Sequence, residues 1–519
     1  MLEDASIYEK LDADPTASTQ KTSNAMLLKI FKSFPDHQRT YRQLRCWNGS
    51  IPRLYGLPKL HKEGIPLRPI VDFSTSPLYE LAKYLHFILQ PLTGQRSSHV
   101  KDSKHFVQKL KPLALAEDEA MVSLDVVSLY TNTPVELAIQ VAKDHLARDN
   151  TLNDRTPLAV SQICELLQLC LTSTVFVFNG GIYKQKFGVA MGASVSVTIA
   201  NLVMEDIERR AGLSMLHTPR LFLRYVDDCF VICERRQVED FCDFLSGIEP
   251  SIKFTIEWEK DGMLPFLDVL VKRLPTGVLE FEVYRKKTHC GRYLHFSSAN
   301  PLNHKISFVS SLANRARIIC SSREAYNKEI SLMTNQLKNN GYSQGFSRRI
   351  IRRKKVSRKK TENSKRIPFP YIPRCSGEIR RICKNYNVSV LEYPSNKIQR
   401  FLGKPKDKMP AHCYQGVVYR IKCADCDMAY IGETVNFSQR MSQHKADIRL
   451  LRTTTSPLAE HAALKLHEFD FENVDILARE RSTVLRKYVE SAHILSSSLP
   501  LLNRNQGALH STYVRFLNK

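Results

Sequence analysis

Two adjacent carboxylates, Asp227 and Asp228, interrupt an otherwise apolar stretch and constrain the fold more than any other feature of the sequence. The stretch Phe222-Leu-Arg-Tyr-Val-Asp-Asp-Cys-Phe-Val-Ile232 has an apolar segment on each side of the pair, which predicts a β-hairpin with the acids at its turn. Carboxylates beside buried strands are costly unless a cation lies close to them. Mg²⁺ fits such a place, since it binds a few carboxylates and keeps its other positions for water and phosphate. A solvated hairpin turn is the alternative that the pair alone leaves open.

A third acid upstream favours the metal-binding interpretation. Met121-Val-Ser-Leu-Asp125 is again an apolar segment, typical of a strand, that ends on a carboxylate. Two-metal phosphoryl transfer needs acids that converge from separate strands, so that two ions about 4 Å apart contact the attacking and leaving oxygens. We therefore expect Asp125 and Asp227 to bridge two Mg²⁺ ions, with Asp228 as an auxiliary ligand.

This arrangement resembles the palm of a reverse transcriptase. Asp125 matches the acid of motif A, and Tyr225-Val-Asp-Asp228 matches the signature of motif C. The resemblance implies that Tyr130, five residues after Asp125, is the steric gate that excludes a 2′-hydroxyl. By the same resemblance, Asp268 in the segment after the hairpin is expected to be structural rather than metal-binding.

The segment between the acids contains a hairpin and a glycine motif. Val175-Phe-Val-Phe-Asn-Gly-Gly-Ile-Tyr183 predicts a hairpin with an Asn-Gly turn. Gly188-Val-Ala-Met-Gly192 then leads into a predicted helix and resembles motif B, where small residues let a template-primer and a nucleotide approach the backbone. The family carries Met-Gly-Ser-Pro-Leu-Ser-Pro here, whereas this sequence has Ala193, Val195 and Val197 and neither proline.

Residues 51–72 alternate prolines and glycines with short apolar pieces, which predicts a hairpin rather than a helix. Lys59, Lys62 and Arg68 lie along it, and lysine and arginine suit the triphosphate of an incoming nucleotide. An ordinary basic hairpin is the alternative. The run Tyr55-Gly-Leu-Pro-Lys-Leu-His-Lys resembles the fingers of the Penelope-like element reverse transcriptases, which implies that Arg68 contacts the nucleotide phosphates.

A second set of polar residues lies near the C-terminus and comprises Tyr419, Tyr430, Arg440, His444, Glu490 and Asn503. The set resembles the GIY-YIG endonuclease domain, although Val417-Val418 stands where that motif has Gly-Ile. A guanidinium neutralises phosphate charge, and a metal held by one carboxylate stabilises a leaving oxygen, so the residue types fit phosphodiester cleavage.

The resemblance to this nuclease also implies a role for each residue of the set. Tyr419 would activate the attacking water with Tyr430 in support, and Arg440 would steady the scissile phosphate. His444 would assist proton transfer and Glu490 would bind one Mg²⁺. Asn503 would support the fold or the site.

Two cysteines and two histidines accompany the nuclease residues. Cys423 and Cys426 lie between the two tyrosines, and His461 and His467 follow downstream. Such a set matches a tetrahedral Zn²⁺ site, whereas buried thiols with surface histidines are the alternative. The Penelope-like endonucleases carry a Cys-Cys-His-His set of this kind, so the resemblance implies a Zn²⁺ ion here.

The order of these features predicts the domain organisation. We expect an α+β chain, in which a right-hand polymerase with fingers, palm and thumb precedes a small α/β GIY-YIG nuclease domain. The expected boundaries are an N-terminal helical segment at 1–50, fingers and palm at 51–270, the thumb at 271–345, a basic linker at 346–405 and the endonuclease at 406–519.

The charge of the chain points to a polyanionic partner. The net charge is +24, and residues 346–366 hold a block of lysines and arginines. Basic and aromatic residues also interleave over 283–305, as in a track for nucleic acid, and the resemblance makes this segment the primer grip. The basic block is typical of a polyanion-binding arm or a nuclear import signal, with a solvated linker as the alternative. We expect a nuclear protein, made in the cytoplasm, without a membrane partner.

The sequence thus predicts an RNA-directed DNA polymerase coupled to a DNA-nicking endonuclease that supports target-primed retrotransposition. The expected partners are an RNA template, target DNA and dNTPs. The family also carries an N-terminal region with an Asp-Lys-Gly motif, which this sequence does not contain. A truncated or decayed copy that retains only endonuclease activity, or a non-catalytic nucleic-acid binder, is therefore the alternative.

Overall fold

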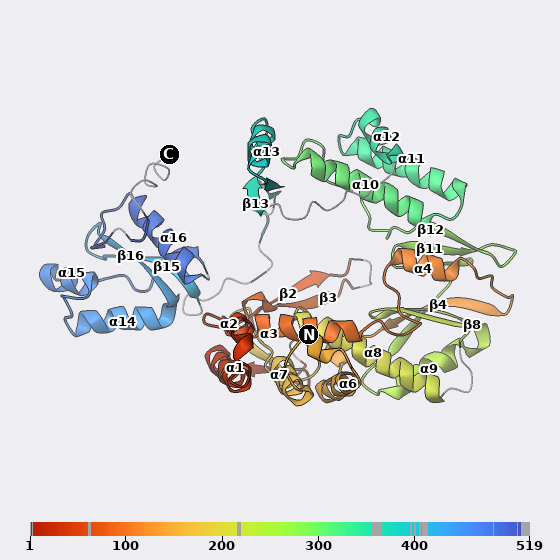
Figure 1. The fold of residues 1–519 in the computed structure, drawn as a ribbon, viewed down its shortest axis with the longest axis horizontal. Coiled ribbons are helices and arrows are strands. Elements are labelled where there is room, and N and C mark those ends of the chain that lie inside the picture. The colour runs from red at the N-terminus through yellow and green to blue at the C-terminus, as the bar shows by residue number, and fades with distance from the viewer. Residues whose placement is uncertain are drawn as a thin grey trace.

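The computed structural model describes residues 2, 4–60, 64–214, 219–353, 365–394, 397–398, 401–403, 406, 414–480, 482–505 and 507–509. These residues form a mixed α/β structure with five β-sheets. Figure 1 shows a large N-terminal body, a helical layer above it, and a separate C-terminal α/β domain at one side. Among the described residues, no helix is long and apolar enough to span a membrane.

The first sheet has five strands in the order β1-β6-β5-β2-β3, namely β1 (Tyr8–Leu11), β2 (Arg53–Pro58), β3 (Leu67–Asp72), β5 (Val175–Phe178) and β6 (Gly181–Gln185). The hairpin predicted over 51–72 is formed by β2 and β3, and the second predicted hairpin by β5 and β6. Asn179 and Gly180 at the tip of the second hairpin have φ angles of +47° and +74°, as a tight Asn-Gly turn requires.

The N-terminal segment is part of this body rather than a separate helical unit. β1 pairs with β6, so that Tyr8 lies opposite Gln185. The helix α1 (Thr16–Phe31) buries Leu27 and Phe31 in the core of the body, and α2 (Gln38–Leu44) buries Tyr41 and Leu44 there. The expected boundary at residue 50 is therefore wrong, because a short strand with few apolar residues joins the sheet through backbone hydrogen bonds that its sequence does not signal.

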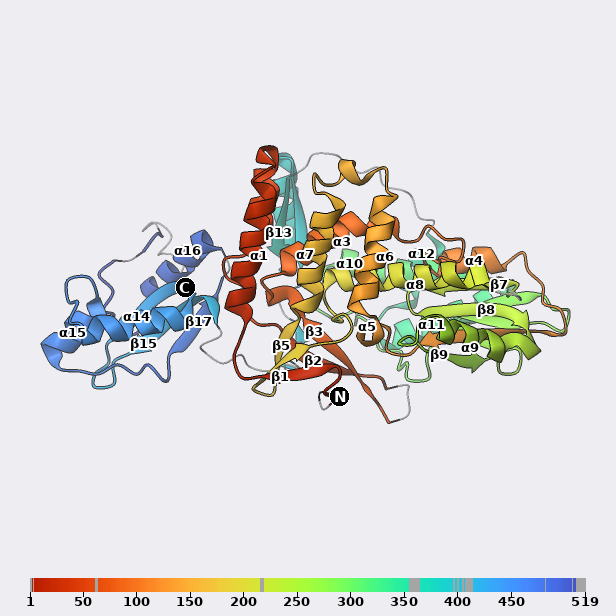
Figure 2. The same cartoon turned by 90° about the horizontal axis from the view of Figure 1, so that it is seen from below.

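A group of helices covers the first sheet and one face of the sheet formed by the segment expected to be the palm, which is called the palm sheet below. It contains α3 (Tyr79–Leu89), α5 (Leu129–Asn132), α6 (Val135–Ala147), α7 (Val160–Thr172), α8 (Ser194–Ser214) and α9 (Val238–Ile248). Apolar residues at helical spacing, such as Ile163, Leu166, Leu167 and Leu171 of α7, face the common core. Figure 2 shows α6 and α7 side by side next to α8.

The palm sheet has the strand order β7-β8-β4-β9, with β4 (Glu119–Val126), β7 (Leu221–Tyr225), β8 (Asp228–Glu234) and β9 (Phe254–Trp258). Alternate residues of the central strands belong to two different cores. Val122 and Leu124 join the helical core, whereas Met121, Phe230 and Ile232 join a second core on the other face. Burial on both faces explains why these strands are almost continuously apolar.

The second core is closed by α4 and a small sheet. α4 (Ser103–Leu110) begins at Asp102, whose side chain accepts a hydrogen bond from His105 N, and packs near β10 (Met263–Phe266), β11 (Val269–Arg273) and β12 (Leu279–Val283). The three strands form one antiparallel sheet. β11 crosses the palm–thumb boundary expected at residue 270, because strand pairing makes residues 263–283 a single unit.

Three helices follow as the layer expected to be the thumb: α10 (Leu302–Ile319), α11 (Arg323–Asn339) and α12 (Gln344–Arg352). Ser322 and Ser343 cap α11 and α12, and Val309, Met333 and Ile350 meet in a core of their own. α12 runs across the boundary expected at residue 345, since its apolar residues pack on α10.

The region expected to be a basic linker contains a small folded unit. β13 (Lys365–Pro370), α13 (Ser376–Asn385) and β14 (Val388–Tyr393) form a parallel βαβ unit. Within the same expected linker, residues 354–364, 395–396, 399–400 and 404–405 lie outside the described residues, and so does most of the basic block.

The C-terminal domain has the strand order β16-β15-β17, with β15 (Gln415–Lys422), β16 (Ala429–Asn436) and β17 (Asp475–Arg479). The helices α14 (Phe437–Arg449), α15 (Pro457–Lys465) and α16 (Thr483–Leu495) accompany the sheet, and each begins at a polar residue whose side chain accepts a backbone hydrogen bond. Val417, Tyr419 and Ile421 alternate along β15 into the core of this domain.

Candidate active sites and metal centre

The three acids of the first predicted site meet at one end of the palm sheet. Asp125 of β4 is the register partner of Asp228, the first residue of β8. Tyr225 pairs with Asp228, so Val226 and Asp227 form a two-residue turn, in which Val226 has a φ of +58°. Val126 N donates to Asp227 O at 3.3 Å and ties this turn to β4. Antiparallel pairing therefore brings together the carboxylates that the sequence predicted to converge.

The electrostatics of Asp227 fit a cation site. Burial raises the pKa of this carboxyl above its usual value, and the negative charge of Asp125 raises the pKa further, while Arg68 and Lys59 act in the opposite direction. Half-buried carboxylates that repel each other bind either a proton or a metal ion. A set of oxygen ligands is the set that Mg²⁺ prefers, so the residues present fit this ion.

The predicted nucleotide-binding residues Arg68 and Tyr130 lie on separate elements, and both are near the same acids. Burial raises the pKa of Tyr130 on α5, Asp227 raises it further, and Arg68 on β3 lowers it. Arg68, Tyr130 and Asp227 are thus close enough to influence one another, as a site for a triphosphate beside the acids requires. Lys62 lies outside the described residues.

The backbone around Gly192 requires a glycine at this position. Its φ is +130°, and a Cβ atom there would lie 2.0 Å from the carbonyl oxygen of Val71 on β3. Val71 N in turn donates to Met191 O at 2.8 Å. The glycine is therefore needed where the motif packs on the first sheet, and its contact with a nucleotide stays a prediction. α8 begins at Ser194 without the prolines of the family motif.

A buried charge network behind the acids was missed by the sequence analysis. Arg224 is fully buried and pairs with Glu208 through its Nε atom. Its Nη1 atom donates to Asn201 Oδ1 at 2.9 Å and to Val226 O at 3.0 Å. Its Nη2 atom lies 3.7 Å from Glu205 Oε1. Arg224 thus holds the turn that carries Asp227. An arginine inside an apolar strand was the signal that could have revealed it, since a buried charge needs partners.

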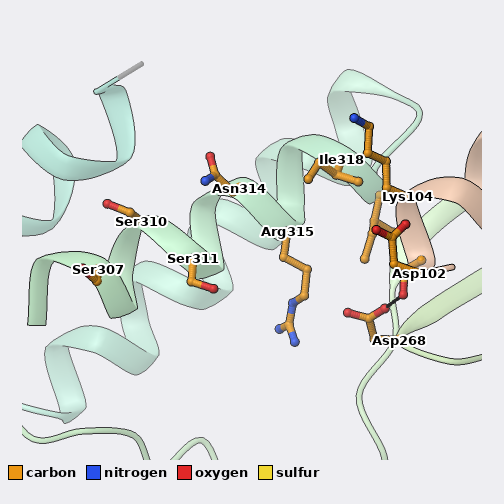
Figure 3. A pocket seen from close by; sticks show the side chains of 11 residues that line it. Asp102, Lys104, Asp268, Ser307, Ser310, Ser311, Asn314, Arg315 and Ile318 are labelled. Carbon is orange, nitrogen blue, oxygen red and sulfur yellow. Dashed lines mark hydrogen bonds between the residues drawn. The ribbon is translucent and has the colours of Figure 1, made fainter. Parts of the chain in front are cut away.

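A cavity of about 580 Å³ lies between α4 and the thumb helix α10 (Figure 3). The α10 side of it is lined by small polar residues and an arginine, namely Ser307, Ser310, Ser311, Asn314 and Arg315. Asp268 faces the cavity and accepts a hydrogen bond from Ser103 Oγ, and its main-chain oxygen accepts one from Tyr284 N. The Ser103 bond ties α4 to the turn between β10 and β11, and the Tyr284 bond ties this turn to the end of β12, so both contacts of Asp268 are structural.

The residues of the second predicted site meet on the C-terminal domain. Tyr419 is fully buried, and its hydroxyl lies 2.8 Å from His444 Nε2. Arg440 Nε, one turn before His444 on α14, donates to the same hydroxyl at 3.4 Å. The ring of Tyr430 lies edge-on to His444, with 5.4 Å between the ring centroids. Two strands and one helix thus bring four of the six predicted residues into contact.

Burial keeps the tyrosine and the imidazole neutral at neutral pH. It raises the pKa of Tyr419 far above its usual value, and Tyr430 raises it further while Arg440 lowers it. Burial and the positive charge of Arg440 lower the pKa of His444 to about 4. A neutral imidazole can accept the hydrogen bond of the tyrosine hydroxyl, which makes the pair a route for a proton.

The metal ligand expected on α16 has an acidic neighbour that the sequence analysis did not single out. Burial raises the pKa of Glu490, and Glu433 on β16 raises it further, whereas Lys487 and Arg440 lower it. Glu433 also pairs with the buried Arg486, whose Nε lies 2.5 Å from Glu433 Oε2. A carboxylate with a raised pKa beside a second carboxylate is suited to a divalent cation.

Gly432 of β16, and Asn503, which follows α16 and bonds to β16, shape this site. Asn503 accepts from Ile431 N at 3.0 Å and donates to Ile431 O at 2.6 Å, so it holds the strand in place. Gly432 is the register partner of Tyr419, and a Cβ atom there would lie 2.6 Å from the Tyr419 hydroxyl and 2.9 Å from the Tyr430 ring. The glycine after the second tyrosine therefore makes room for both rings, a role that the sequence analysis did not assign.

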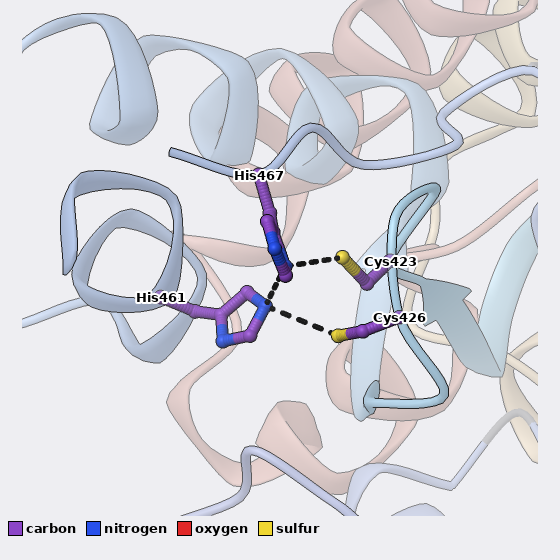
Figure 4. A group of neighbouring side chains, drawn as sticks. All are labelled: Cys423, Cys426, His461 and His467. Carbon is purple, nitrogen blue, oxygen red and sulfur yellow. Dashed lines mark hydrogen bonds between the residues drawn. The ribbon is translucent and has the colours of Figure 1, made fainter. Parts of the chain in front are cut away.

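The predicted zinc ligands form one cluster (Figure 4). Cys423 Sγ lies 3.5 Å from His467 Nδ1, Cys426 Sγ lies 3.5 Å from His461 Nε2, and the two nitrogens are 3.2 Å apart. A tetrahedral Zn²⁺ with usual bond lengths places sulfur and nitrogen ligands about 3.6 Å apart and two nitrogens about 3.3 Å apart. The four side chains therefore have the spacing of a structural zinc site, which would join the β15–β16 turn to α15.

Two family models match parts of the chain. Residues 415–487 match the GIY-YIG catalytic domain, and residues 292–352 match the animal helix-turn-helix domain. The chain therefore carries a GIY-YIG domain in its C-terminal part, and the second match covers the α10–α12 helices. No curated protein matches the chain.

Solved structures of polymerases resemble the chain at low identity. Telomerase from Candida albicans, in complex with a fragment of telomeric RNA, has 13% identity and a TM-score of 0.40 over 64% of this chain and 61% of its own. The BmCPV RNA-dependent RNA polymerase has 12% identity and a TM-score of 0.37 over 62% of this chain and 30% of its own. The chain thus spans about three fifths of the length of the telomerase.

Proposed function

We propose that the chain is an RNA-directed DNA polymerase of the Penelope-like type, joined to a DNA-nicking endonuclease. The observation that carries the polymerase part is the meeting of Asp125, Asp227 and Asp228 at one end of the palm sheet, with Arg68 and Tyr130 close by. The observation that carries the nuclease part is the GIY-YIG match together with the Tyr419–His444–Arg440 contacts.

In the polymerase step, the 3′-hydroxyl of a primer attacks the α-phosphorus of a dNTP, and pyrophosphate leaves. Asp125 and Asp227 would hold two Mg²⁺ ions, which when bound neutralise charge on the phosphates and on the attacking oxygen. Arg68 and Lys59 supply positive charge beside the β- and γ-phosphates. Their attraction for the leaving pyrophosphate grows as negative charge develops on it. Tyr130 would block a 2′-hydroxyl, so the substrate class is deoxynucleotides.

In the nuclease step, water attacks the scissile phosphorus, and the 3′-oxygen leaves and takes a proton from solvent, so that the products are a 3′-hydroxyl and a 5′-phosphate. Tyr419 takes the proton from water as it gives its own to His444 Nε2, along the 2.8 Å contact. Arg440 neutralises the charge that gathers on the phosphate oxygens. Glu490, with Glu433 beside it, would hold one Mg²⁺, which when bound stabilises the leaving oxygen.

The nicked strand provides the primer for the polymerase, which is the basis of target-primed retrotransposition. The partners of the protein are then an RNA template, a DNA target and dNTPs. The +24 charge supports binding to nucleic acid in general, and the basic block over 346–366 supports nuclear import. Zn²⁺ bound by the Cys423 cluster would stabilise the nuclease fold without taking part in its chemistry.

Two single substitutions separate the proposed activities. Asp227→Ala is expected to abolish Mg²⁺-dependent dNTP incorporation on an RNA template while nicking of supercoiled DNA continues. Arg440→Ala is expected to abolish nicking while incorporation from a supplied primer continues. Loss of both activities after either change, in a protein that folds, would contradict the proposal of two sites. Nicking without any incorporation by the unaltered protein would favour a decayed polymerase.

A further inference from the structure

The nuclease site borders a cavity that the N-terminal segment helps to form. This cavity of about 580 Å³ has Gln20 and Trp47 on one side and Glu433, Arg440 and Gln443 on the other. The two sides also touch, because a Cβ atom on Gly416 would lie 3.3 Å from Asn48 Nδ2. In Figure 2, α1 stands directly beside the nuclease domain. Arg440, which is assigned to the scissile phosphate, thus lines a cavity whose opposite wall belongs to the N-terminal body, called the polymerase body below.

Trp47 is exposed in this cavity but held by a rigid loop. Asn24 and Gln20 of α1 fix the loop after α2. Asn24 bonds the main-chain O and N of Cys46 at 2.7 and 3.0 Å, and Gln20 bonds Gly49 N at 2.9 Å, Trp47 O at 3.4 Å and Cys46 Sγ at 3.4 Å. The indole nevertheless remains 62% exposed. Tryptophan is enriched at binding interfaces, where its ring meets an apolar partner and its N–H a polar one, and the anchored loop fixes the place of this ring.

The surroundings of Trp47 favour a nucleobase as the ligand. The Arg45 guanidinium lies 3.7 Å from the centroid of the indole ring and adds positive charge to it. Nucleobases stack on aromatic side chains and on arginine planes regardless of their sequence. A second hollow of about 200 Å³, which shares Trp47 and Gly49 with the first, continues past Arg45 toward Tyr79 on α3. Trp47 therefore lies where the Arg440 cavity and this second hollow meet.

We infer that Trp47 and Arg45 form a stacking platform for an unpaired base of the target DNA strand, next to the phosphate that Arg440 contacts. The nuclease domain alone would then lack part of its substrate site, and the polymerase body would supply it. This inference rests on the proposed nuclease function, since it takes DNA as the ligand of the Arg440 cavity. It adds an N-terminal residue of the polymerase body to the recognition of the cleaved strand.

Tryptophan fluorescence tests the platform without any catalysis. The chain has two tryptophans, Trp47 and Trp258, so Trp258→Phe in the full chain leaves Trp47 as the only one. A short DNA duplex with one unpaired base is added in Mg²⁺-free buffer, and its binding is followed separately by anisotropy of a label on the DNA. Stacking predicts that Trp47 emission is quenched in parallel with binding. Saturable binding with unchanged Trp47 emission would overturn the inference.

Nicking provides the second readout. Base stacking contributes about 1–3 kcal/mol, so Trp47→Ala should lower the nicking rate at subsaturating DNA roughly five- to a hundredfold, and Trp47→Phe should restore most of it. Primer extension on an RNA template is expected to stay unchanged and serves as the folding control. Nicking by Trp47→Ala at the unaltered rate would show that Trp47 contacts something other than DNA. If the unaltered protein does not nick at all, the proposed nuclease function fails, and the fluorescence result still decides the platform.

Discussion

Replacement of Arg224 by leucine should destabilise the polymerase body and impair its active site together. The guanidinium is fully buried and lies between Glu208, Glu205 and the carbonyl oxygen of Val226. Leucine would leave buried Glu205 without its cation and buried Glu208 with only Arg96, whose Nε lies 3.4 Å from Glu208 Oε2. Removal of one partner of a buried ion pair costs about 3–5 kcal/mol, and loss of the hydrogen bond to the Val226 turn adds about 1 kcal/mol. Since a domain is stabilised by only about 5–15 kcal/mol, the loss is a large fraction of the total.

Urea unfolding followed by tryptophan fluorescence measures this change, because both tryptophans, Trp47 and Trp258, lie in the polymerase body. Arg209→Leu is the matched control, since Arg209 is half-exposed on α8 and pairs with Asp206 at the surface. Such a surface pair contributes about 0–1 kcal/mol. Arg224→Lys keeps the charge but not the planar fork, so its loss should be intermediate.

The kinetics of primer extension distinguish a positioning role from simple destabilisation. Under conditions where Arg224→Lys is still folded, we expect a lower kcat at nearly unchanged KM for dNTP, because the turn that carries Asp227 is displaced while Arg68 and Lys59 remain. DNA nicking should continue. The reasoning is refuted if Arg224→Leu destabilises the body no more than Arg209→Leu does and extends primers at the unaltered rate.

Three further predictions concern the nuclease domain. Gly432→Ala adds a methyl group 2.6 Å from the Tyr419 hydroxyl and should lower nicking about a hundredfold in a plasmid assay, as expected for a reacting group displaced by about 1 Å; nicking at the unaltered rate would contradict this. Cys426→Ser should lower the bound zinc found by elemental analysis and the thermal midpoint of the nuclease domain, and equal zinc content would exclude a site at Cys426. The pKa of His444 is about 4 in the folded chain and near 6.5 when unfolded, so the unfolded state binds more protons between these values. Stability should therefore fall by up to about 3 kcal/mol as the pH drops from 6.5 to 4, and His444→Gln should remove this dependence.

The elements that the sequence predicted well are those with a strong local pattern. The Asn179-Gly180 turn, for example, identifies its hairpin without reference to the rest of the chain. The convergence of Asp125 with Asp228 could also be predicted, because Asp125 lies at the end of one apolar strand, Asp228 lies at the start of another, and the chemistry that joins them is specific. The domain boundaries were less accurate, since β11 and α12 continue across them for reasons of packing.

The features that could not be predicted depend on contacts between distant segments. Nothing in the sequence near Tyr8 indicates that β1 pairs with β6. The need for Gly432 becomes apparent only when β15 places Tyr419 opposite it. In the same way, Trp47 lies in a polar N-terminal segment without a motif, and it becomes a candidate only because the nuclease domain lies beside it.

The central claim is that the nuclease supplies the primer that the polymerase extends. The most direct test supplies the protein with circular DNA, an RNA template, dNTPs and Mg²⁺, and measures complementary DNA joined covalently to the nicked strand. The account predicts joined product from the unaltered protein, nicks without product from Asp227→Ala, and neither from Arg440→Ala unless the DNA is nicked beforehand. Complementary DNA that is never joined to the nicked strand, or failure of a prior nick to rescue Arg440→Ala, would contradict it.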